Sequence, residues 1–143
     1  MYSLVSIVFR MGFGLSLSLC LGYGGILCSL LILDYVLYTM PDLVLSPWFV
    51  RASWFSTLGI LSGIGSYFAW TDLDKISKID PVLIVSLIIM GMVGSWAGLY
   101  YSLSVNAGSS YPYHPVSGAA LFTSAFAANG ISLVIVLLRK VRE

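Results

Sequence analysis

Few side chains in this sequence could take part in acid–base, redox or metal chemistry. His114 is the only histidine, and it lies in the segment SSYPYHPVSG. A haem held between two histidines needs a second imidazole, and a zinc site needs three or four N, O or S donors. His114 could therefore supply one ligand to a site shared with another subunit, or carry protons at an external surface. The alternative, which we favour, is a hydrogen-bonded loop or interface residue.

Three further polar side chains, Asp34, Arg51 and Asn129, lie within or beside long apolar segments. A charge inside hydrocarbon is unfavourable and often marks a path for protons or ions. Arg51 is a plausible partner for Asp34 or Asp42, and a pair or an extended arginine at the membrane surface is the simpler interpretation. An unpaired amide at mid-membrane costs several kcal/mol. Asn129 must therefore face another helix, water or a ligand, and we expect a hydrogen bond between helices.

Thiol chemistry and the common catalytic motifs are not indicated by the sequence. Cys20 and Cys28 are eight residues apart in one apolar run. On a helix this separates them by about 12 Å, too far for a disulfide, so we expect two small packing residues. Nucleophile-elbow, phosphate-loop and zinc-protease motifs are missing. We therefore predict no catalytic residue, no metal site and no cofactor of its own, although a bound lipid or quinone is compatible with the chain.

The composition is that of an integral membrane protein. Hydrophobic residues make up 59% of the 143 residues and charged residues only 9%, against about 25% charged in soluble domains. The formal net charge of +1 provides no basic surface for nucleic acid. The apolar run that starts at Met11 and ends at Leu33 exceeds the core of about 7–15 residues of a signal peptide, so we expect a retained helix.

Four apolar segments are long enough to cross a bilayer, which takes about 20 residues. These predicted spans cover approximately residues 11–33, 47–70, 81–103 and 117–138. Ser46-Pro47 and Asp80-Pro81 each place a capping side chain before a proline at the first helical position. The sequence therefore predicts an all-α fold, a bundle of four transmembrane helices that forms a single domain over residues 1–143.

The distribution of lysine and arginine predicts the orientation of the bundle. With the N-terminus on the cytoplasmic side, six of the seven basic residues lie on that side and Arg51 alone on the other. The six are Arg10, Lys75, Lys78, Arg139, Lys140 and Arg142. We therefore predict that both termini lie on the cytoplasmic or equivalent inner side of a cell membrane or an energy-transducing organelle membrane.

Small residues recur at four-residue intervals in every predicted span, a pattern that lets membrane helices approach closely. The positions that we expect at helix–helix contacts are Gly14, Ser18, Gly22, Gly59, Gly63, Gly94, Gly98, Ser124 and Ala128. The first span carries a second series, formed by Ser16, Cys20, Gly24 and Cys28. One series could serve the internal bundle and the other a neighbouring subunit.

The shortage of reactive groups, together with several small-residue faces, favours a non-catalytic accessory subunit of a larger integral-membrane complex, respiratory or otherwise energy-transducing. Such a subunit would brace partner helices and hold lipid or quinone. One alternative is a small carrier or pore that uses Asp34, Arg51 and Asn129. Another is a quinone-linked oxidoreductase component that uses the outer loop around Tyr113 and His114. The expected partners are other membrane subunits and the lipid bilayer, with no nucleic acid.

Overall fold

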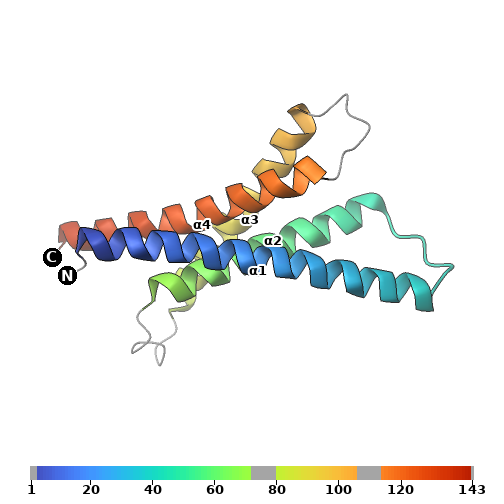
Figure 1. Ribbon diagram of the computed structural model, residues 1–143, viewed down its shortest axis with the longest axis horizontal. Helices are drawn as coiled ribbons and strands as arrows, with labels where there is room; N and C mark the ends of the chain where they lie inside the picture. The colour runs from blue at the N-terminus through green and yellow to red at the C-terminus, as the bar shows by residue number, and fades with distance from the viewer. Residues whose placement is uncertain (1–2, 72–79, 106–113, 143) are drawn as a thin grey trace.

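The computed structural model describes residues 3–71, 80–105 and 114–142. These residues form four α-helices, and the all-α prediction is confirmed for them. The helices are α1 (Leu4–Thr39), α2 (Pro47–Trp70), α3 (Pro81–Val105) and α4 (His114–Arg142). Consecutive helices run in opposite directions, so α1 begins and α4 ends at the same end of the bundle (Figure 1).

Helix α1 is the longest element and extends beyond its predicted span at both ends. Its 36 residues correspond to about 54 Å, well beyond the roughly 30 Å of a hydrocarbon core. At its start the Ser3 hydroxyl accepts a hydrogen bond of 3.2 Å from the Ser6 backbone N–H, an N-terminal cap. Its two charged residues, Arg10 and Asp34, do not interrupt the helix. By contrast, α2 has the same bounds as its predicted span.

Three of the described helices are long and apolar enough to cross a membrane, and they are α1, α3 and α4. This is compatible with a membrane protein. Helix α2 is not among them because Arg51, four serines and three glycines lower its hydropathy. It packs against all three other helices, although apolar side chains such as Ile60 and Phe68 remain exposed. The small apolar core also includes α2, through Phe55, which packs with Leu99, Ala120 and Trp96.

The helices approach so closely that backbone meets backbone. A methyl group built on Gly63 of α2 would lie 2.7 Å from the Cα atom of Ile88 in α3. One on Gly98 of α3 would lie 2.6 Å from the Cα atom of Ala120 in α4. Both distances are shorter than carbon–carbon contact allows, so these positions exclude any side chain. Similar approaches join Gly59 to Met92 and Gly65 to Ser18.

We expect Gly63→Ala to lower the free energy of unfolding by about 1–3 kcal/mol, because the added methyl group overpacks the α2–α3 contact. Gly130→Ala is the matched control, since nothing lies within 4 Å of a methyl group at that position and alanine favours helix. Unfolding in mixed micelles by titration with a denaturing detergent, followed by circular dichroism, measures both. Equal stability of the two variants would contradict the close contact.

Candidate functional site

The small residues predicted to pack helices are all buried. This holds for Gly14, Ser18, Gly22, Gly59, Gly63, Gly94, Gly98, Ser124 and Ala128. They occupy the contacts of α1 with α2 and α4, of α2 with α3, and of α3 with α4. A methyl group on Gly14, for example, would collide with the Asn129 side chain, and one on Gly22 would lie 2.8 Å from Leu121.

Asn129 of α4 joins three helices through buried hydrogen bonds. Its side chain is fully buried. The amide nitrogen donates to the Ser18 hydroxyl of α1 at 3.1 Å and to the Ala125 carbonyl of its own helix at 2.9 Å. The amide oxygen accepts from the Trp70 indole N–H of α2 at 3.1 Å. All of its polar atoms are therefore engaged, as its place in the apolar interior requires.

Serine and threonine hydroxyls supply further hydrogen bonds between helices. Four donate to backbone carbonyls and one pair is hydroxyl to hydroxyl, at distances between 2.6 and 2.9 Å. The bonds are Ser18 to Ser62 O, Ser95 to Phe55 O, Thr123 to Gly94 O, Ser124 to Gly91 O, and Ser66 with Ser132. Among the described residues only the Ser62 hydroxyl is buried without a partner.

Arg10 has a structural role that the sequence analysis missed. Its guanidinium donates to the backbone carbonyl of Trp70 at 3.1 Å. The last carbonyls of a helix have no partner within the helix and carry partial negative charge, so a cation here stabilises the end of α2. From the sequence, the positive charge of Arg10 predicted only the side of the membrane, because Trp70 lies 60 positions further along the chain and no local pattern links the two residues.

The remaining polar candidates do not gather around Asn129. Asp34 is exposed on α1, and the Arg51 guanidinium lies over the Trp48 ring, 5.8 Å from its centroid. No ion pair joins Arg51 to either Asp34 or an acid elsewhere in the described ranges. Arg51 is about 28 Å along α2 from Trp70, the partner of Asn129. These groups therefore lie towards opposite ends of α2.

The loop around the single histidine is only partly described. His114 is the first residue of α4, but its side chain, like Tyr111 and Tyr113, lies outside the described part. Within the described residues, no group of three or more histidine, cysteine, aspartate or glutamate side chains could hold a metal ion. The proposed roles of His114 in a shared metal site or in quinone chemistry stay predictions.

The second small-residue series of α1 lies on the surface. We call Ser16, Cys20, Gly24 and Cys28 the outer series. Both cysteines are exposed, and the Ser16 hydroxyl donates only within its own helix. A methyl group on Gly24 would have nothing within 4 Å in the described chain. One helix thus carries two similar series, of which one contacts α2 and α4 and the other is largely exposed among the described residues.

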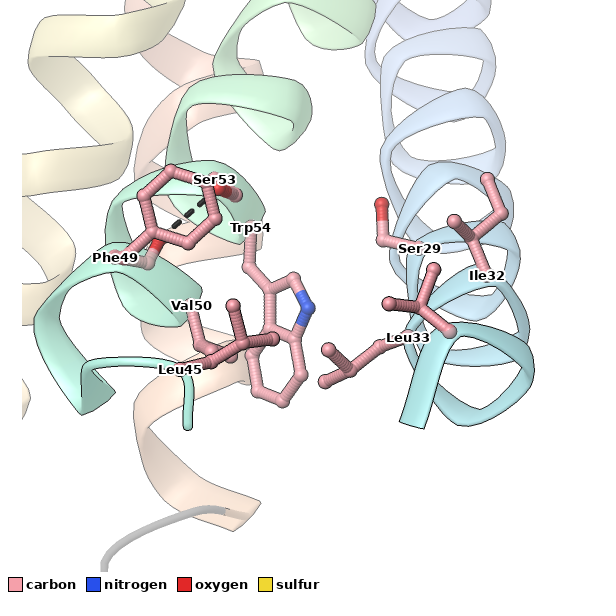
Figure 2. Close-up of a pocket in the computed structure, with 9 residues that line it drawn as sticks. Ser29, Ile32, Leu33, Leu45, Phe49, Val50, Ser53 and Trp54 are labelled. Carbon is pink, nitrogen blue, oxygen red and sulfur yellow. Dashed lines mark hydrogen bonds between the residues drawn. The ribbon is translucent and has the colours of Figure 1, made fainter. Parts of the chain in front are cut away.

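A cavity of ≈ 280 Å³ lies between the second half of α1 and the start of α2. Its walls include Ser29 and Leu33 from α1 and Val50 and Trp54 from α2. Figure 2 shows the Trp54 indole standing between the two helices, with its nitrogen directed towards α1. The walls are mainly apolar, and the Ser53 hydroxyl is already engaged with the carbonyl of Phe49 at 2.9 Å.

Protein-family models, curated proteins and solved structures were all compared with this chain, and none matches. The function must therefore be inferred from the structure itself: the outer series, the buried hydrogen bonds between helices and the cavity.

We expect Asn129→Ala to lower the free energy of unfolding by about 1–2 kcal/mol, because two hydrogen bonds between helices are lost. A double-mutant cycle with Trp70→Phe should give a coupling energy of about 0.5–1.5 kcal/mol. Ser16→Ala, which removes a bond within one exposed helix, should change stability by less than about 0.5 kcal/mol. Additive effects of the Asn129 and Trp70 substitutions would show that the two side chains do not interact.

Proposed function

We propose that this chain is a non-catalytic accessory subunit of a larger integral-membrane complex, and that the outer series of α1 is the contact for a helix of another subunit. The observation that carries the proposal is a difference between the two small-residue series of α1: one packs within the bundle and the other does not. Gly14, Ser18 and Gly22 face the bundle, whereas Gly24 and the cysteines face outwards.

The argument follows from how helices associate in lipid. Apolar side chains gain little by leaving acyl chains for one another, so small residues that permit close backbone contact mark helix interfaces. Only 11% of the most apolar stretch of α1 is buried within the chain, against 33% for α3. Helix α1 is therefore peripheral to its own bundle and has a free face on which a partner helix can pack.

The same proposal includes four membrane crossings, with both termini on the inner side of a cell membrane or an energy-transducing organelle membrane. Two observations support it. Helix α2 is as long as a span and packs against the three other helices. With four crossings, six of the seven basic residues of the sequence would fall on the side of the two termini, in keeping with the preference of lysine and arginine for the cytoplasmic side.

A structural role is supported by the interior of the bundle, where the buried polar groups are hydrogen-bonded to one another. The hydrogen bonds of Asn129, Ser66 and Ser95 run between helices, which rigidifies the bundle and leaves few groups for chemistry. The carrier alternative would need Asp34, Arg51 and Asn129 along one path. The separation of Arg51 from Asn129 along α2 gives that alternative no support.

Site-specific photocrosslinking in native membranes tests the subunit proposal. Leu27 is exposed and lies one turn from Gly24, so Leu27→p-benzoylphenylalanine should yield an adduct with a different membrane protein, identified by mass spectrometry. Val93, exposed on α3, is the matched control and should yield lipid adducts alone. Gly24→Leu should reduce the Leu27 adduct at least fivefold by preventing close approach.

Two results would contradict the proposal. An adduct of twice the mass of the chain would make the outer series a contact between identical copies. Lipid adducts alone at both positions would mean that α1 faces the bilayer. Circular dichroism of each variant in detergent checks that the bundle itself is intact.

A further inference from the structure

Tyr23 places a phenol hydroxyl on the outward face of α1, halfway along the apolar part of the helix. Its neighbour Gly22 is the midpoint of the apolar run from Met11 to Leu33. A methyl group on Gly22 would lie 3.7 Å from the side chain of Leu58, which is at the middle of the 24 residues of α2. Tyr23 is 57% exposed. With α1 and α2 crossing the membrane as proposed above, its hydroxyl lies in the hydrocarbon, about 15 Å from either membrane surface.

The Tyr23 hydroxyl makes no hydrogen bond within the residues that the structure describes. By contrast, the Ser16 hydroxyl on the same face donates to the Gly12 carbonyl of its own helix. An unpaired hydroxyl in hydrocarbon is unfavourable, and tyrosine is otherwise concentrated at the membrane surface. The oxygens of lipid headgroups lie at that surface, farther away than a tyrosine side chain extends. The acceptor for Tyr23 must therefore come from another molecule that reaches the centre of the membrane.

The surroundings of Tyr23 fit a second helix. Cys20 lies three residues before it, on the same helix face, and is exposed. A methyl group on the adjacent Gly24 would have nothing within 4 Å in the described chain. A helix that packs on these small residues comes close enough for its backbone to meet the phenol. A helical carbonyl can accept a second hydrogen bond, as those that face Ser95 and Ser124 in this bundle do.

We propose that Tyr23 donates a hydrogen bond to an oxygen at the middle of the partner helix that packs on the outer series. The acceptor is a backbone carbonyl left accessible by a small residue, or the side-chain oxygen of a serine, threonine, asparagine or glutamine. This inference rests on the subunit proposal and adds the chemistry of the partner. The partner helix carries small or polar residues at its centre and is not uniformly covered by large apolar side chains.

Tyr23→Phe removes the hydroxyl alone and tests the bond. The affinity-tagged full chain is solubilised from native membranes, and the partner identified by the Leu27 crosslink is quantified by mass spectrometry as the detergent concentration rises. We expect Tyr23→Phe to shift the equilibrium from retained towards released partner by roughly two- to tenfold, the effect of one hydrogen bond between membrane helices. Tyr35→Phe is the matched control. Tyr35 is also exposed on α1, but it lies about 18 Å further along the helix, at the membrane surface where water is available, so its replacement should leave retention unchanged.

Unfolding of the isolated chain in mixed micelles completes the test. Tyr23→Phe should not change its stability, and a loss of stability would place the bond within the chain and overturn the inference. Equal retention of the partner by Tyr23→Phe and the unmodified chain would overturn it too, while a crosslinked partner at Leu27 would leave the subunit proposal standing. If the effect of Tyr23→Phe disappears in membranes from which quinone has been extracted, the acceptor is a quinone and not a helix. Lipid adducts alone at Leu27 would remove the subunit proposal and this inference together.

Discussion

Helices surrounded by lipid gain little from burying apolar side chains against one another, because acyl chains are equally apolar. Cohesion must then come from van der Waals contact at very short range and from hydrogen bonds between helices. This chain meets the first requirement with glycine: Gly63 and Gly98 bring α2, α3 and α4 into backbone contact. The glycines and serines that make these contacts also lower the hydropathy of α2.

Serine meets both requirements at once. It is small enough for close packing, and its hydroxyl donates to a carbonyl of the facing helix, as Ser18, Ser95 and Ser124 do. Each such bond contributes only about 0.6 kcal/mol on average, but together they fix the relative positions of the helices. Asn129 adds a link among α1, α2 and α4. These hydrogen bonds also leave few side chains for catalysis or transport, because a group that is bonded to a neighbouring helix is not free to bind a ligand or transfer a proton.

Local patterns predicted the helices well and their partners poorly. Pro47 marks the start of α2, although the Ser46 side chain makes no capping hydrogen bond as had been expected. The Asp80 side chain does cap α3, accepting from the Val82 and Leu83 N–H groups. Four-residue spacing also identified residues that are buried, because these signals act within one helix. The partner of Asn129 depends on the relative register and rotation of three helices, which no spacing within α4 encodes. The pairing of Arg10 with the end of α2 was missed for the same reason. The sequence also left open which series of α1 faces inwards, a choice made only by packing against α2 and α4.

The central claim is that α2 crosses the membrane as one member of a four-helix bundle. Single cysteines introduced at Asp42 and Thr71, just outside the two ends of α2, test it most directly in a chain that also carries Cys20→Ser and Cys28→Ser. Labelling of sealed membrane vesicles with an impermeant maleimide, before and after permeabilisation, reports the side of each cysteine. The account predicts that the cysteine replacing Asp42 is labelled from the outer side and the one replacing Thr71 from the inner side. Labelling of both from the same side would contradict it.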